Sequence, residues 1–138
     1  MKKNLLVIAG LSLLAINSYS LDNIVPKDVA TKVCLALQKM DYQELKKYAD
    51  EPAIIKIDTN EENKAKTEAH LKLLSEDKRE EAQKSYDDKM WRMKSAMSAL
   101  DCKNIVIMDG IDANNKVAII DNKPTSLKLI NGVWKLTQ

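Results

Sequence analysis

The chain is short and nearly balanced in charge, with 138 residues, 22 Lys and Arg and 20 Asp and Glu. Removal of an N-terminal leader that contains Lys2 and Lys3 takes the basic count from 22 to 20, so the mature chain is formally neutral. Because binding to nucleic acid rests on phosphate neutralisation by a basic surface, this balance argues against nucleic acid as a partner.

Residues 1–20 have the three parts of a secretory signal peptide. Two lysines form the charged region, Leu5 to Ile16 form the apolar region, and Ser18 and Ser20 supply small side chains before a cleavage point. An uncleaved anchor is the alternative, but the apolar stretch falls short of the roughly 20 residues needed to cross a bilayer. We therefore expect cleavage after Ser20 and a single periplasmic or secreted domain, residues 21–138, with no membrane span.

Two helices are expected at the start of the mature chain. Pro26 fits the first turn of a helix, and a stripe at helical spacing follows it: Val29, Val33, Leu37 and Met40. Asp41 and Glu44 then form a capping box that opens a second short helix after a tight junction. We expect Pro52 to end that helix, and the β-branched run Ala53 to Asp58 predicts a strand.

The pattern from Asn60 to Leu100 is helical again, with a capping box expected at Thr59 and Glu62. Sixteen residues between Glu61 and Lys89 are charged, nine acidic and seven basic, which indicates a solvated helix face. A second start signal at Ser75 predicts two helices or one bent helix.

An apolar stripe runs along the end of this segment, through Ala82, Tyr86, Met90, Met93, Met97 and Leu100. Methionine fills gaps in cores and also forms adaptable binding surfaces, and core packing is the favoured interpretation. Trp91 lies beside the stripe, where an indole can face a partner or the rim of a cavity.

Four short runs with strand-like composition complete the chain: Lys103 to Asp109, Lys116 to Asp121, Thr125 to Ile130 and Val133 to Thr137. Their short connections predict an antiparallel meander, so the fold class is α+β, with helices packed on one face of a curved sheet. A two-residue turn at Asn131 and Gly132 would pair Leu129 with Trp134. Trp134 is then expected to fill the core between the sheet and the first helix, with cavity lining as the alternative.

The two cysteines, Cys34 and Cys102, are expected to pair, because the chain has an export signal. The chain-entropy model gives roughly 4 kcal/mol for a loop of this length. Two separately buried thiols are the alternative.

Residues 25–138 resemble the nuclear transport factor 2-like superfamily, particularly its small exported, lumazine-binding-like and uncharacterised periplasmic branch. The resemblance is carried by Met40-Asp41-Tyr42 between two helices and by Gly132-Val133-Trp134-Lys135 in the last strand. It implies a cone-shaped fold, with a curved sheet around helices and a cavity at the open end. Family enzymes such as ketosteroid isomerase place a general base there. The long charged segment between Asn60 and Lys89 departs from the minimal cone.

No catalytic signature accompanies this resemblance. His70, the single histidine, lies among charged residues on a polar helix and is expected at the surface. The pairs Glu80-Glu81 and Asp87-Asp88 are adjacent in a helix and point in different directions, so neither predicts a metal or acid–base site. We expect no cofactor and no metal.

The leading hypothesis is an exported non-enzymatic binding module for a small apolar ligand or a protein partner, with inhibitor, immunity or homodimer roles included. A small isomerase- or dehydratase-like enzyme with a cavity carboxylate base is the alternative. An interaction arm formed by the charged helices is a third interpretation. The candidate cavity or interface residues are Tyr42, Tyr48, Tyr86, Met90, Trp91 and Trp134.

Overall fold

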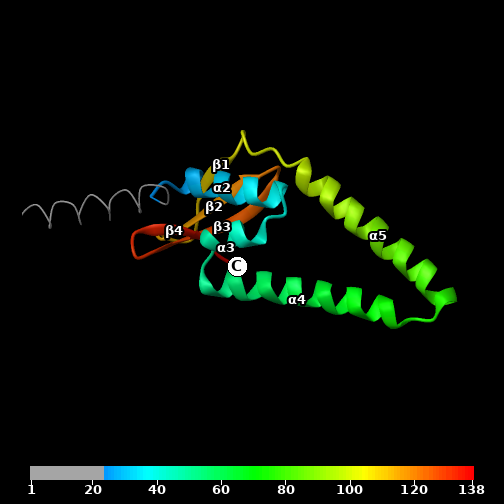
Figure 1. Cartoon of the computed structure of the whole chain (residues 1–138). Coiled ribbons are helices and arrows are strands. Elements are labelled where there is room, and N and C mark those ends of the chain that lie inside the picture. The colour runs from blue at the N-terminus through cyan, green and yellow to red at the C-terminus, as the bar shows by residue number, and fades with distance from the viewer. Residues whose placement is uncertain (1–23) are drawn as a thin grey trace, which may run out of the picture.

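The structure is a computed structural model that describes residues 24–138, so the predicted signal peptide lies outside the described residues. Within them the chain forms helices first and strands last, an α+β arrangement as predicted (Figure 1). The helices are α2 (Pro26–Gln38), α3 (Tyr42–Lys47), α4 (Glu51–Leu73) and α5 (Glu76–Ser98). The strands are β1 (Val106–Asp109), β2 (Asn115–Ile120), β3 (Lys123–Ile130) and β4 (Val133–Leu136).

The four strands form an open antiparallel meander in the order β1-β2-β3-β4. The predicted strands are confirmed with small boundary shifts, the largest being at β1, which begins at Val106 rather than Lys103. The register of the closing hairpin is also as predicted, with Leu129 opposite Trp134. Asn131 and Gly132 have φ values of 52° and 80°, as a two-residue type I′ turn requires.

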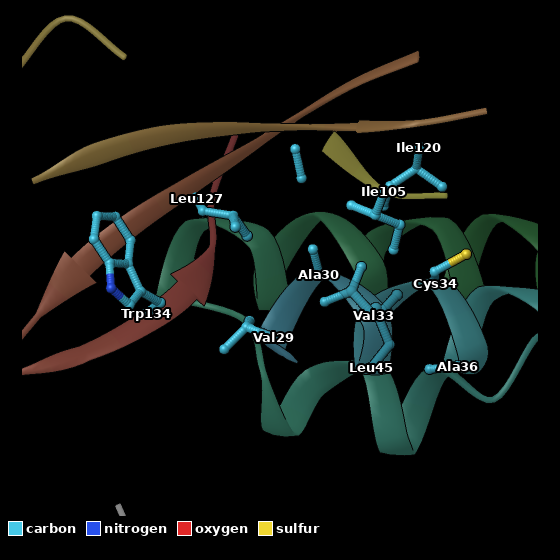
Figure 2. Close-up of a cluster of buried hydrophobic side chains, with 11 residues drawn as sticks. Val29, Ala30, Val33, Cys34, Ala36, Leu45, Ile105, Ile120, Leu127 and Trp134 are labelled. Carbon is cyan, nitrogen blue, oxygen red and sulfur yellow. The ribbon is translucent and has the colours of Figure 1, made fainter. Parts of the chain in front are cut away.

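The core lies between α2 and one face of the sheet (Figure 2). Val29, Val33 and Cys34 on α2 are fully buried and point toward the strands. Trp134 packs at one end of this cluster and is 7% exposed, which confirms its predicted place in the core. We call α2, α3 and the sheet the body.

The starts of α2, α3 and α5 follow the predicted signals. Pro26 occupies the first turn of α2. The Asp41 side chain accepts a hydrogen bond from the backbone N–H of Glu44 at 3.0 Å and caps α3. Ser75 is the N-cap residue of α5, so the charged segment is two helices.

The predicted strand Ala53 to Asp58 is wrong, because these residues belong to α4. Asp50 caps this helix, with its carboxylate accepting a hydrogen bond from the N–H of Ala53 at 3.0 Å. Pro52 lies in the first turn, where its missing N–H costs nothing, so it begins a helix and does not end one.

One further expectation for this region changes with it. The predicted capping box at Thr59 and Glu62 is wrong, since both residues lie inside α4. Near this region the only β-type pairing among the described residues is a single parallel bridge between Ala49 and Leu136, at the outer edge of β4. The sheet therefore has no strand from the first half of the described chain.

Helices α4 and α5 project from the body as a V-shaped hairpin, which we call the arm (Figure 1). They meet at the tip around Ser75 and diverge toward the body. Leu71 is buried near the tip, and the Arg79 guanidinium donates to the carbonyl of Leu74 at 2.7 Å. No residue of α5 is fully buried, so the arm has no continuous core of its own.

The base of each arm helix is fixed to the body. The predicted disulfide is present: Cys34 on α2 is bonded to Cys102, just after α5. The Gln38 side chain donates to the carbonyl of Leu100 at 2.5 Å beside it. These two links fix the end of α5 to α2.

The start of α4 is fixed to the last strand and the C-terminal residues. The Asp50 backbone N–H donates to the carbonyl of Leu136 at 2.8 Å, and the Thr137 hydroxyl donates to the Asp50 carboxylate at 2.5 Å. The Gln138 amide donates to the carbonyl of Pro52 at 2.8 Å. The separation of the two arm helices is thus set at their bases by contacts that are distant in sequence.

Candidate functional site

A cavity of about 590 Å³ lies between the arm helices and the adjoining part of the body. This volume falls within the roughly 300–1,000 Å³ of sites that bind small organic ligands. All of its lining residues come from α2, α3, the arm and the C-terminal residues: Leu37, Tyr42, Leu45, Ala53, Lys56, Ile57, Asn60, Glu61, Asn63, Lys64, Thr67, Tyr86, Lys89, Met90, Met93, Leu136, Thr137 and Gln138.

Apolar side chains gather where the arm meets the body. This apolar wall consists of Leu37 of α2, Leu45 of α3, Ala53 and Ile57 of α4, Met90 and Met93 of α5, and Leu136 of β4. Leu45 and Ala53 are buried in the protein, whereas the two methionines are half-buried. The wall can therefore bury apolar surface of a ligand without rearrangement of the body.

The methionine stripe of α5 was predicted to pack in the core, and the structure places it differently. Leu100 packs against the core, but Met90 and Met93 line the cavity and remain half-buried. The facing side of α4 carries Lys56 and Lys64. Closure of the arm would bring these ammonium groups against the thioethers at a desolvation cost, which favours the open arrangement that the contacts at the helix bases set.

A hydrogen bond across the arm lies beside the outer end of the cavity. The Tyr86 phenol on α5 donates to the Glu68 carboxylate on α4 at 2.7 Å. This bond to a carboxylate raises the pKa of Tyr86 to about 12, so the phenol remains a donor at neutral pH. Tyr86 also lines the cavity, so the bond helps to close the cavity on the side of the tip.

The carboxylate that lines the cavity, Glu61, already has a cationic neighbour. Its Oε2 lies 3.4 Å from Nζ of Lys46, which also contacts Asp58 at 2.5 Å. Burial and the nearby Glu61 charge raise the pKa of Tyr42, which keeps this second phenol protonated inside the cavity. The hydroxyl groups of two tyrosines thus flank an apolar wall, and that of Tyr86 already donates to Glu68.

The structure brings three of the six candidate residues to the cavity: Tyr42, Tyr86 and Met90. Trp134 is in the core, and Trp91 is 69% exposed and is absent from the lining. Tyr48 packs against the core, and its phenol donates to Glu44 at 3.1 Å. Burial, followed by this hydrogen bond, raises the pKa of Tyr48.

The α4 side of the cavity was missed by sequence reasoning. Lys56, Asn60, Lys64 and Thr67 recur at spacings of four, four and three residues, which is helical. This helical spacing predicts one face of α4 only if Ala53 to Asp58 are taken as the start of a helix. His70 is exposed, as expected.

Among residues 24–138 no group of three or more His, Cys, Asp and Glu side chains is arranged to hold a metal ion. In the same part of the chain, no helix combines the length and apolar character needed to cross a membrane.

Comparison with known proteins gives no match to a family model, to a curated protein or to a solved structure.

Proposed function

We propose that this protein is an exported, non-enzymatic module that binds a small apolar ligand in the cavity of the arm. The observation that carries the proposal is the cavity of about 590 Å³ with an apolar wall at the base of the arm. A concave apolar surface with a few polar groups around it is the usual form of a small-molecule site. Tyr42 supplies one such group as a hydrogen-bond donor, and the Tyr86 hydroxyl, which already donates to Glu68, can accept a hydrogen bond.

The proposed location is the periplasm or the exterior of the cell. The Cys34–Cys102 disulfide supports it, because such bonds persist in oxidising compartments. The signal-like segment at residues 1–20 supports it independently.

Kinship with the nuclear transport factor 2-like superfamily is part of the proposal. The helix pair capped at Asp41 and the final hairpin that carries Trp134 support it. The helical Ala53–Asp58 segment departs from the expected order of elements. The ligand site is therefore argued from this chain's own cavity and not from that of the family cone.

The experiment is a fluorescence titration of the mature, oxidised protein with Nile red, a neutral apolar dye. Met90→Gln/Met93→Gln keeps side-chain size but makes the α5 wall polar. Each methionine in contact with a ligand contributes on the order of 1 kcal/mol, so the double change, worth about 2 kcal/mol, should weaken binding about thirtyfold.

Met97→Gln is the matched control, because Met97 lies on the same helix, is half-buried like the other two methionines and does not line the cavity. We expect its affinity for Nile red to equal that of the wild type. Equal weakening by both changes, or no dye binding at all, would contradict the proposed site.

An isomerase- or dehydratase-like enzyme remains the alternative proposal. Its base would be Glu61, the carboxylate among the lining side chains. That side chain is 38% exposed and lies 3.4 Å from Nζ of Lys46, so it is in a solvated, ion-paired environment and not in an apolar pocket. Turnover that is abolished by Glu61→Gln would favour the enzyme.

A protein partner, in the form of a second copy of the chain, is also proposed on a separate observation. The edge strand β1 exposes Val106 and Met108, which are 57% and 54% exposed. Two such edges can pair antiparallel about a two-fold axis. Light scattering should then show a dimer that Val106→Lys dissociates.

A further inference from the structure

The side chains that line the cavity carry an excess of positive charge. Three lysines contribute to the lining, Lys56, Lys64 and Lys89, and none of them forms an ion pair in the part of the chain that the structure describes. Glu61 is the one carboxylate among the lining side chains, and it lies 3.4 Å from Nζ of Lys46. Positive charge in the cavity is therefore left for a ligand to neutralise.

Two of these lysines lie at the same level of the arm. The hydrogen bond between Tyr86 and Glu68 fixes the antiparallel register of α5 against α4. Lys64 is one helical turn from Glu68 toward the body, and Lys89 is about one turn from Tyr86 in the same direction. Lys64 and Lys89 thus face the cavity from opposite helices, near its outer end.

The neighbouring acid forms no salt bridge with Lys64. Glu68 lies four residues after Lys64, but its carboxylate accepts the hydrogen bond from Tyr86 and forms no ion pair within 4.0 Å among the described residues. The cationic outer end and the apolar wall near the body therefore form two chemically distinct parts of one cavity.

The cavity is also elongated. Its α4 side runs from Ala53 to Thr67, which are 14 residues apart, or ~21 Å at the rise of an α-helix. Met90 and Met93 follow the same direction on α5 toward the body. A long, narrow apolar group can follow this course with its polar end at Lys64 and Lys89.

On the basis of the proposed function, we propose that the ligand is an anionic single-chain amphiphile. Its alkyl chain lies along Ile57, Met90 and Met93 toward the body, and its carboxylate or phosphate lies between Lys64 and Lys89. The ligand's anionic head group would then bridge two like charges, the ammonium groups of Lys64 and Lys89 on the two arm helices, as charge complementarity requires.

The test measures binding of decanoate, decyl phosphate and decanol to the mature, oxidised protein by calorimetry, below micelle-forming concentrations. We expect each anion to bind about tenfold more tightly than decanol, because two partly solvated ammonium groups contribute modestly each. The preference should shrink as ionic strength rises. Similar preference for both anions would indicate charge recognition, and a preference for one would identify the head group.

Lys64→Met/Lys89→Met removes both charges and keeps side-chain length, so the ratio of anion to alcohol affinity should fall to about one. Lys66→Met/Lys84→Met removes the same charge from the same helices at exposed positions outside the lining and should keep the tenfold ratio. Equal ratios in the two variants would overturn the inference. Equal affinity for decanol and decanoate in the wild type would overturn it while leaving the apolar site intact, and no binding of any of the three would defeat both.

Discussion

The body and the arm are stabilised in different ways. In the body, α2 and the sheet share a core in which Val29, Val33 and Leu127 are fully buried. In the arm, α5 has no buried residue and α4 has two, Ala53 at the base and Leu71 near the tip. The body therefore has a core of its own, whereas each arm helix is fixed to the body at its base and the space between the two helices is open. An opening of that kind is where a ligand can enter without disrupting the core.

The largest expected effect is in the body. Trp134→Ala should lower the free energy of unfolding by about 3–5 kcal/mol, as removal of a buried aromatic side chain from a core does. Trp134 is 7% exposed and packs within the core cluster. Urea denaturation followed by circular dichroism measures this change in the free energy of unfolding. The exposed Trp91→Ala is the control, with a change of at most about 0.5 kcal/mol. Similar costs for both would remove the distinction between body and arm.

The next largest effect concerns the link between the two regions. Cys34 and Cys102 are 68 residues apart, and the loop that they close contains the whole arm. Cys34→Ser/Cys102→Ser should lower the free energy of unfolding by about 4 kcal/mol in the chain-entropy model. It should also weaken Nile red binding, because the base of α5 loses its covalent link to α2. Chemical reduction of the wild type should reproduce both effects, and unchanged binding would show that the disulfide does not hold the cavity open.

A smaller effect is expected within the arm. Leu71→Ala should cost about 2 kcal/mol, the lower end for a buried leucine, because solvent can reach the space that it leaves. Leu73 is 84% exposed, so Leu73→Ala should change stability by no more than about 0.5 kcal/mol. Hydrogen exchange of Leu71→Ala should show a loss of protection in peptides of the arm alone. Equal loosening of α2 peptides would mean that the arm and the body unfold as one unit.

The smallest effect is a pH dependence at the outer end of the cavity. The pKa of Tyr86 is raised from 10.0 to about 12, chiefly by its hydrogen bond to Glu68. Because this pKa is raised, the contribution of the Tyr86–Glu68 hydrogen bond to stability is complete below about pH 10 and is lost as the pH rises through about 12. Ultraviolet titration should show a late phenolate component that Tyr86→Phe removes and Glu68→Gln shifts toward lower pH. A component that is unchanged by both substitutions would contradict the bond.

The features predicted correctly from the sequence depend on local signals. Asn131-Gly132 fixes both the turn and the register of the last hairpin, because alternation leaves one arrangement with Trp134 inside. Asp41 marks the start of α3 by capping it with its side chain, and Ser75 marks the start of α5 by its N-cap position, without a capping hydrogen bond from its side chain. The Cys34–Cys102 pairing needed only the count of cysteines and the expected compartment.

The features that were missed depend on a short window or on distant contacts. Six residues from Ala53 to Asp58 cannot distinguish a helical period from that of a strand, and their β-branched content favoured the wrong one. Asp50 can be recognised in the sequence as the cap of α4 only if Pro52 is taken as a residue of the first helical turn. The cavity depends on the angle between α4 and α5, which links at Cys102 and Leu136 set from far along the chain.

The most direct test of the ligand site is hydrogen exchange of the mature, oxidised protein with and without saturating Nile red. Without the dye, peptides of the arm should exchange faster than those of α2 and the sheet, since buried contacts are concentrated in the body. With the dye, we expect added protection from exchange in residues 53–67 and 86–93 and no change across the sheet. Protection confined to the exposed apolar strand β1, or to no segment while the dye is bound, would contradict a ligand site in the arm.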